Sequence, residues 1–411
     1  MHTKYAVAEE EWLEICRNYS DDKLLDLPAD LLEEFTQKGI LIIQYEKITF
    51  RADYLFTYFV AKEMNNNIVL FDYITSDAAF YSNYKELVFY GELEGVDNGR
   101  LLNSVHSRLS ELELEIKTSY ASEGIDLQER WESVLVEDSE DDNEHYESTL
   151  RDTSSAKQTP ETLKHARNRD LLQVDRGRGI TERAAVKALE SKWYVAMKSY
   201  FQMIKHSSNL DGNEKLLHMQ KAIESSELFV MSLAAKKDLL CSKAVVFRSG
   251  ILYFNPLVEI DPEKARRDFK FAAPNSFARV LGDLMANPQL SPAFRRLLKS
   301  NSELARYLAR HLLLEIPNSE NRIAFLEDLM KSDNLVLQTC SMNQLKNKYL
   351  GYALDEESRL YYKSMIKAIT SNSELLNQNQ QRALEKRRML ADMKRNFEHA
   401  GRGNRVLSGS H

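Results

Sequence analysis

The sequence of 411 residues is poor in residues that interrupt helices and in residues that form disulfides. It contains 14 glycines, 8 prolines and 3 cysteines. So few glycines and prolines argue against a β-sandwich or a linker-rich chain and favour a mainly α-helical fold. The cysteines, Cys16, Cys241 and Cys340, are far apart and form no CxxC pair. The sequence therefore predicts no disulfide framework and no zinc site, and we expect a cytoplasmic protein.

Long apolar runs are also lacking. The first residues, MHTKYAVAEEEW, contain no apolar segment of the kind that a signal peptide needs. One of the longest apolar runs, Leu228 to Ala235, is far too short to span a bilayer. We therefore expect no membrane association.

Motifs for catalysis and phosphate binding are missing as well. The nine histidines form no HExxH or HxH pair, and no GxSxG occurs. The dipeptide Gly-Lys, which a P-loop requires, is absent from the sequence. The run Ile68 to Asp72 is similar to a magnesium-binding strand, but without a P-loop we interpret it as a buried helix segment. We expect a chain that is not an enzyme by itself and binds no cofactor or metal.

Charge is distributed unevenly within a net charge of −7. Glu132 to Ser148 contains eight acidic residues and no lysine or arginine, so we interpret residues 131–158 as an acidic linker or loop. Gln381 to Arg405 contains eight bases and three acids, and most of this segment belongs to an expected basic helix from about Glu374 to His399. This helix either contacts nucleic acid or an acidic partner, or forms a solvated face. Its candidate contact residues are Lys386, Arg387, Arg388, Lys394 and Arg395.

The first 66 residues show the pattern of a small mixed domain. Apolar spacing predicts helices over Glu9 to Tyr19 and Ala29 to Lys38. The first has one apolar face, formed by Trp12, Ile15, Cys16 and Tyr19, and Gly39 is expected to end the second. Two short strands, Ile40 to Gln44 and Lys47 to Arg51, follow with a tight turn between them. A helix then runs from Asp53 to Met64, and its expected buried side includes Leu55, Tyr58 and Phe59. Two helices and a two-stranded ribbon are the ending of a winged helix, whose opening helices would lie partly outside this chain.

The rest of the chain is expected to be helical. An aromatic-rich segment follows the ribbon, and a long helical hairpin follows the acidic segment. The first helix of this hairpin, which ends at about His206, has one apolar face formed by Trp193, Met197, Tyr200, Phe201 and Ile204. Later helices of roughly 12–16 residues are separated by short polar joints, APNS being the first, whose Ser, Asn, Asp and Pro residues cap the next helix. Their spacing predicts stacked, α-solenoid-like helices or an irregular helical domain. The expected domains are 1–66 (winged-helix-like), 67–130 (aromatic-rich helical), 131–158 (linker or loop), 159–245 (helical hairpin), 246–372 (repeat-like helical) and 373–411 (basic helix and tail).

The stretch GILIIQYEKITFRADYLFTYFVAKEM, Gly39 to Met64, resembles the end of the winged-helix domain of STAND NTPases, especially of the NACHT group. In that family a G-I-L strand, a short turn and a strand ending in Phe lead into a helix of the form F-x-H-x-x-F-x-E-Y-F-x-A. We expect the large apolar residues among the matching positions to tie the helix to the ribbon and to whatever packs next. The matching positions here are Phe50, Leu55, Tyr58, Phe59 and Ala61.

Two departures from the family pattern change what the resemblance implies. The family histidine that contacts the nucleotide falls on Ala52 here, so nucleotide contact is not carried over to this position. The nucleotide-binding domain that normally precedes the winged helix is not part of the sequence. The resemblance then implies an ATPase on a separate chain, a fragment, or a homologue that has lost its ATPase.

The resemblance implies a non-enzymatic regulatory and sensor part of a STAND-type signalling NTPase, in prokaryotic anti-phage defence. Its partners would be a nucleotide-binding ATPase domain and a protein trigger. One alternative is a winged-helix regulator that binds nucleic acid, although Asp30, Glu33 and Glu34 on the second helix would repel phosphate. The other alternative is a structural α-helical scaffold.

Overall fold

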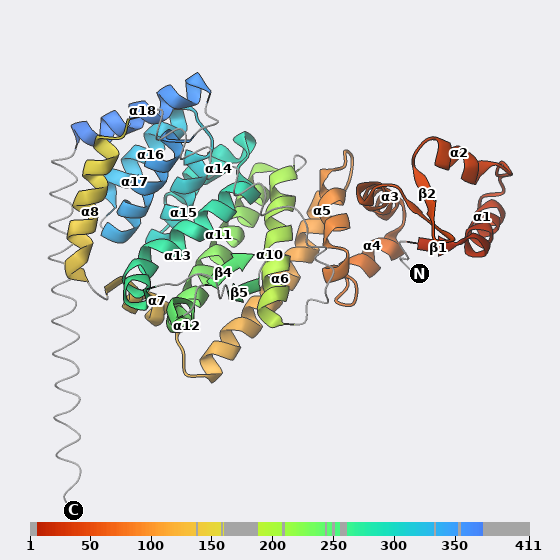
Figure 1. Cartoon of the computed structure of the whole chain (residues 1–411), viewed down its shortest axis with the longest axis horizontal. Helices are drawn as coiled ribbons and strands as arrows, with labels where there is room; N and C mark the ends of the chain where they lie inside the picture. Colours follow the sequence, from red (N-terminus) through yellow and green to blue (C-terminus); the bar gives the residue numbers. More distant parts are fainter. Residues whose placement is uncertain are drawn as a thin grey trace, which may run out of the picture. The chain divides into compact units, whose positions relative to one another are not determined.

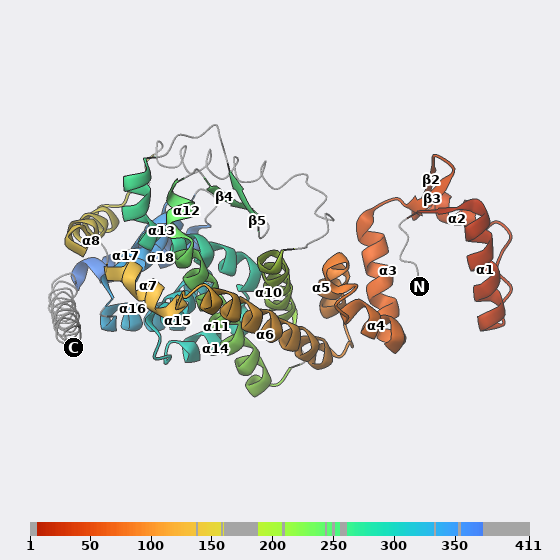
Figure 2. The same cartoon turned by 90° about the horizontal axis from the view of Figure 1, so that it is seen from below.

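The computed structural model describes residues 6–136, 139–157, 159, 188–207, 210–242, 245–248, 251–254, 261–332, 334–351 and 355–372. The fold is mainly α-helical with a small sheet near the N-terminus, as the composition predicts (Figures 1 and 2). The chain divides into two compact units. We call residues 1–105 with 206–209 the N-terminal unit, and residues 106–205 with 210–411 the helical unit.

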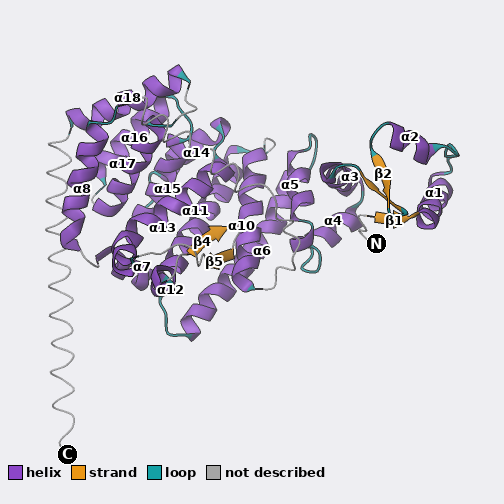
Figure 3. Cartoon of the chain, in the orientation of Figure 1, coloured by secondary structure: helices purple, strands orange, loops and turns teal. Residues whose placement is uncertain are grey.

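The N-terminal unit begins with an antiparallel three-stranded sheet (Figure 3). Its elements in chain order are β1 (Ala6–Ala8), α1 (Glu9–Lys23), α2 (Leu31–Gln37), β2 (Leu41–Gln44) and β3 (Lys47–Phe50). The strand order is β1-β3-β2. The β2–β3 ribbon confirms the predicted hairpin, whereas β1 was not expected, because three residues are too few to show an alternating pattern.

Left-handed backbone closes the turns of this sheet. Gly39 has φ +70° after α2, where a glycine avoids a steric penalty. Tyr45 and Glu46 have φ of 53° and 62°, which are the values of a type I′ hairpin turn. Such turns usually carry Asn and Gly, so a tyrosine and a glutamate occupy this one at a conformational cost.

Short helices complete the N-terminal unit. These are α3 (Asp53–Asn66), α4 (Ile68–Thr75), the 3-10 turn η1 (Phe80–Ser82), α5 (Tyr84–Glu92) and the start of α6 (Asn98–Ser122). The run Ile68 to Asp72, which we interpreted as a helix segment, forms the first part of α4. Its position places Leu70, Phe71 and Ile74 in the core with side chains from the neighbouring helices, among them Ala61, Met64, Phe80, Leu87 and Tyr90.

The acidic segment of the helical unit is folded, which corrects our interpretation of residues 131–158 as a linker. Most of it forms the end of α7 (Leu127–Val136) and all of α8 (Ser139–Ser154). Helix α8 packs mainly against α17 (Leu335–Tyr349), beside which it lies in Figures 1 and 2. Tertiary packing has overridden the poor helix propensity of its Ser, Asp and Asn residues.

Two long helices form the expected antiparallel pair. They are α10 (Leu189–His206) and α11 (Gly212–Ala235). The rings of Trp193 and Phe229 lie 5.5 Å apart, and those of Tyr200 and His218 lie 5.8 Å apart. The predicted apolar face of α10 is confirmed, since all five of its residues are buried: Trp193, Met197, Tyr200, Phe201 and Ile204.

A short helix and a hairpin precede the last helices. They are α12 (Lys237–Ser242), β4 (Val245–Arg248) and β5 (Ile251–Phe254). Helix α13 (Pro262–Met285) then continues through Pro274. The expected joint at APNS was therefore wrong, since the helix does not end there although Pro274 lacks a backbone N–H.

The remaining joints are where the polar residues predict them. After the 3-10 turn η2 (Pro288–Leu290) come α14 (Ser291–Leu297), α15 (Glu303–Leu314), α16 (Ser319–Lys331), α17 and α18 (Glu356–Ser371). Neighbours in the chain such as α14, α15 and α16 pack together, but α17 also packs on α13 and α15, and α8 packs on α17 and α18. The side chains that cap these helices are Ser302, Asn318, Asn334 and Asp355.

Some expectations lie outside the described residues. They include the basic helix with Lys386, Arg387, Arg388, Lys394 and Arg395. Within the part of the chain that the structure describes, every helix is too short or too polar to cross a bilayer.

Candidate protein-binding surface

Helices α1 and α2 have apolar residues but bury none of them. Trp12 of α1 lies edge-on to Phe35 of α2, with 6.3 Å between ring centroids, and both are half-buried. Ile15 and Tyr19, expected to share the covered face with Trp12, are about half exposed. The apolar face of a helix in a protein core is normally covered by other side chains. Part of the apolar face of α1 is not covered by any described residue.

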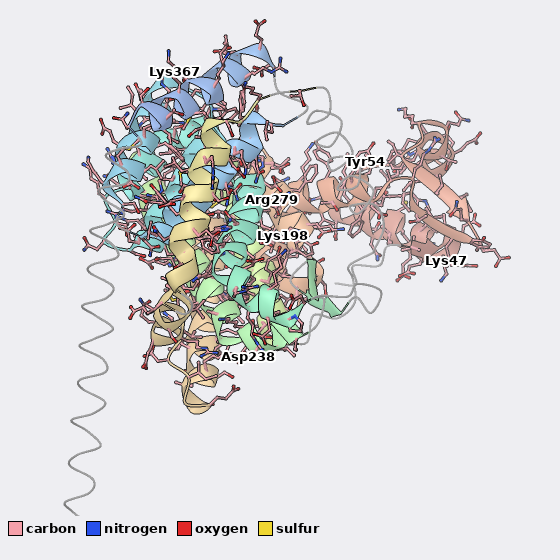
Figure 4. All side chains as sticks on the ribbon, turned by 60° about the vertical axis from the view of Figure 1, so that its left-hand side comes forward. Lys47, Tyr54, Lys198, Asp238, Arg279 and Lys367 are labelled. Atoms are coloured by element: carbon pink, nitrogen blue, oxygen red, sulfur yellow. The ribbon has the colours of Figure 1, made fainter. Side chains whose placement is uncertain are left out.

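The N-terminal unit exposes most of the large apolar side chains that the described surface shows. Of eighteen such residues, twelve lie between Leu13 and Tyr73, and Tyr54 is labelled in Figure 4. Single exposed apolar residues are ordinary, but a concentration of them marks an interaction surface. The twelve are Leu13, Ile15, Tyr19, Leu24, Leu25, Ile43, Tyr45, Tyr54, Phe59, Ile68, Val69 and Tyr73.

Two of these residues have almost fully exposed side chains and a backbone conformation that is unfavourable for them. Leu24 is 92% exposed and Tyr45 is 97% exposed. Each has φ of 53°, a left-handed conformation that costs about 1–2 kcal/mol for a residue with a Cβ atom. Glycine or asparagine would fit either position better and expose less apolar area. Because both side chains are exposed, neither gains burial energy that would offset the cost of the left-handed backbone.

The surroundings of α1 and α2 are acidic. Residues Glu9 to Lys38 contain ten acidic and three basic side chains, a net charge of −7. Helix α2 carries Glu33 and Glu34 in its first turn. The potential of such a surface repels phosphate backbones and attracts a basic protein surface.

The residues that carry the family resemblance lie in and around α3, with different degrees of burial. Ala61 is fully buried, Phe50, Leu55 and Tyr58 are half-buried, and Phe59 is 42% exposed. The expectation that Phe59 lies on the buried side of α3 was therefore wrong. The buried residues of α3 are instead Phe56, Thr57, Ala61 and Met64, which face away from the expected side.

Aromatic contacts still link these residues to their neighbours. The Phe50 ring lies 5.8 Å from both Phe56 and Phe59. The Tyr58 ring lies 6.2 Å edge-on from Phe89 of α5. These contacts connect the hairpin to α3 and α3 to α5, and edge-on pairs of this kind add to the stability that burial gives.

A buried polar contact also fixes α3 on α5. The Thr57 hydroxyl donates to Glu86 Oε1 at 3.2 Å, and Glu86 is only 1% exposed. Burial raises the pKa of the Glu86 carboxyl above its ordinary value. Sequence analysis missed this pair, because neither residue belongs to a recognisable pattern.

Asp72, at the end of the apolar run Ile68 to Asp72, has a structural partner. Arg100 Nη2 lies 2.8 Å from Asp72 Oδ1, and the Arg100 guanidinium lies over the Phe71 ring at 4.5 Å. This ion pair and cation–π contact join α4 to α6. Among the described residues no three His, Cys, Asp or Glu side chains converge to hold a metal ion.

The most perturbed histidine belongs to the core of the helical unit. The Tyr200 hydroxyl lies 2.7 Å from His218 Nδ1. Burial, with a smaller contribution from nearby His106, lowers the pKa of His218 to about 4. His218 is therefore neutral at neutral pH, as a hydrogen-bonded core residue packed between helices.

Comparison with known proteins gives one match. The model of the family described as Novel STAND NTPase 4 matches residues 5–60, which run from the start of β1 into α3. This segment of the chain is thus related to STAND NTPases. No curated protein and no solved structure matches the chain.

Proposed function

We propose that the chain is a non-enzymatic regulatory part of a STAND-type signalling NTPase. Its N-terminal unit docks on a nucleotide-binding domain that lies outside these 411 residues. The residues contain no Gly-Lys dipeptide for a P-loop, which supports a separate nucleotide-binding domain, and the experiment below tests whether another polypeptide supplies it.

One coincidence carries the proposal. The residues that match the STAND family model include the two helices that bury no side chain. In the same segment, Leu24 and Tyr45 are held exposed in strained backbone. The segment is related to a family of multidomain switches, and its apolar face is exposed. Both properties are expected of a module that docks on another domain.

The order of elements supports a winged-helix-type module. A strand, two helices and a two-stranded ribbon pair as β1-β3-β2. In a winged helix that reads DNA, the second helix of such a pair enters the major groove. Here that helix is the acidic α2, which favours protein docking over nucleic-acid binding.

The proposed mechanism is two-state docking. In one state the N-terminal unit packs on the nucleotide-binding partner, and in the other it is released. The helical unit would recognise a protein trigger and bias this equilibrium. A role in anti-phage defence follows from the family resemblance.

Co-purification with a STAND ATPase encoded beside this gene tests the proposal. The wild-type chain is expected to associate with it, and the double variant Ile15→Lys/Tyr19→Lys is expected to lose the complex. Ile323→Lys is the matched control, because Ile323 is similarly exposed but belongs to α16. If the wild type fails to associate with or without nucleotide, docking in trans is wrong.

Duplex DNA binding measured at two salt concentrations tests the alternative. The acidic surface predicts no binding at low salt. Tight binding that falls steeply with salt would favour a nucleic-acid regulator instead, with the basic residues near Arg387 as the first to mutate.

A further inference from the structure

Helix α8 presents a narrow stripe of residues to the rest of the helical unit. The buried positions follow the spacing i, i+4, i+7, i+8 and i+11, which is one face of a helix. Only two of the five are apolar, and the remaining surface of α8 is polar. The stripe consists of Asp142, Tyr146, Thr149, Leu150 and Thr153.

The surface that receives α8 is much more apolar than α8 itself. Tyr146 and Leu150 enter a cluster built from the ends of α15 and α16 and from α17 and α18. The helices concerned lie together in Figure 1, and α18 carries the labelled Lys367 in Figure 4. Leu314, Phe325, Met342, Leu345 and Met365 are among the members of this cluster.

Lysines stand at the two ends of this surface and meet acidic residues of α8. Lys270 Nζ of α13 lies 2.5 Å from Asp142 Oδ1, and both side chains are buried. Lys346 Nζ of α17 lies 3.4 Å from Asp152 Oδ2. We call this receiving surface, which α8 covers, the groove. It is complementary in charge and shape to a helix with an acid at each end and an aromatic residue between them.

The helical state of α8 depends on these contacts more than on its own sequence. Its sequence, SEDDNEHYESTLRDTS, is rich in Ser, Asp, Asn and Thr, which disfavour helix in the absence of packing. A cavity of about 350 Å³ also remains between α8 and α13, where His145, Ser148, Arg267 and Phe271 line it. Fixing sixteen residues costs backbone entropy that two buried apolar side chains offset only in part.

We propose that this groove is a helix-binding site and that α8 is its exchangeable occupant. The competing ligand is an acidic amphipathic helix of a partner protein, with an Asp or Glu four residues before an aromatic residue and an aliphatic residue four residues after it. Such a ligand is soluble alone and folds on binding, as α8 does. The proposal is independent of the docking of the N-terminal unit, and it holds if no ATPase binds there.

Hydrogen exchange of the full chain is the first test. If α8 opens locally, its amides are expected to exchange at least about 100-fold faster than those of α17, most of whose residues are buried. Equal protection in the two helices would overturn the proposal, because α8 would then open only with the whole unit.

The second test adds a labelled peptide of residues 139–156 to the full-chain variant Tyr146→Ala/Leu150→Ala. Saturable binding is expected, at least 10-fold weaker for a peptide carrying Tyr146→Ala and weaker at high salt. No binding by a variant that retains its helical circular dichroism would overturn the proposal. Concentration-dependent dimers that exchange α8 would assign the groove to a second copy instead. Should the variant not fold, the exchange measurement on the wild type decides.

Discussion

Helices α1 and α8 show opposite relations between sequence pattern and packing. Helix α1 has the apolar spacing of a packed helix, yet none of its residues is buried. Helix α8 has the composition of a linker, yet Tyr146 has no exposed surface. Periodicity reports which face of a helix is apolar, but whether that face is covered depends on the rest of the fold.

The difference has a thermodynamic meaning. A helix whose apolar face is not covered gains little from tertiary packing, and its exposed residues remain available for a partner. A polar helix that is covered depends on packing for its existence. We therefore expect mutations in the cluster beneath α8 to act on stability, and mutations of the exposed apolar residues of α1 to act on association.

The largest expected effect compares one residue from each region. Phe325→Ala removes a fully buried ring from the cluster beneath α8 and is expected to cost about 3–5 kcal/mol. Leu13→Ala in α1 is expected to stay within about 0.5 kcal/mol, because Leu13 is already more than half exposed. Urea denaturation of both variants measures the change in the free energy of unfolding. Equal losses in the two variants would contradict the difference between α1 and the cluster beneath α8.

A second comparison tests the face of α3. Phe56→Ala is expected to cost about 3 kcal/mol, since Phe56 is buried between the hairpin and the helices. Phe59→Ala is expected to cost about 1 kcal/mol, because Phe59 keeps 42% of its surface in water. Thermal denaturation monitored in the N-terminal unit decides. A larger loss for Phe59 would place the buried stripe where the family pattern predicts it.

Acid is expected to act in opposite directions at one site in each unit. The pKa of His218 is about 4 in the fold and about 6.5 when unfolded, so the unfolded chain takes up the proton first. Its contribution is complete above pH 6.5 and is lost as pH falls towards 4, by on the order of 1–3 kcal/mol. Glu86 has a raised pKa, so its contribution is present at low pH and lost as pH rises through that pKa.

Variants isolate the two titrations. His218→Gln is expected to flatten the dependence of the free energy of unfolding on pH between 4.5 and 7. Glu86→Gln is expected to stabilise the N-terminal unit more at pH 7 than at pH 4. If His218→Gln keeps the wild-type slope, other groups govern the acid response of the helical unit.

The smallest expected effect concerns the strained residues. Leu24→Gly and Tyr45→Asn relieve left-handed backbone at exposed positions, so each is expected to leave stability unchanged or to raise it by about 0.5–1 kcal/mol. Binding to the ATPase partner is expected to weaken in the same variants. A gain in stability without loss of binding would show that these side chains are not anchors.

The sequence predicted the parts of the fold that local chemistry determines. The β2–β3 hairpin, the glycine after α2, the face of α10 and the helix caps from Ser302 onward follow from spacing and from turn and cap residues. It failed where distant packing decides. These cases are the covering of α8, the choice of the buried face of α3 and the pairing of β1 with β3. The resemblance located the candidate site in the right segment, but the exposure of Leu24 and Tyr45 needed the structure.

Pro274 has a consequence for how α13 and α17 move. Two carbonyls of α13 flank the proline. The Phe271 carbonyl accepts from the Cys340 thiol, with 3.6 Å between Sγ and the oxygen, and the Asn275 carbonyl accepts from Gln344 Nε2 at 3.3 Å. Cys340 and Gln344 are one helical turn apart on α17. Sliding α17 along its own axis would therefore break both bonds together. These bonds favour a movement in which α13 and α17 shift as a pair.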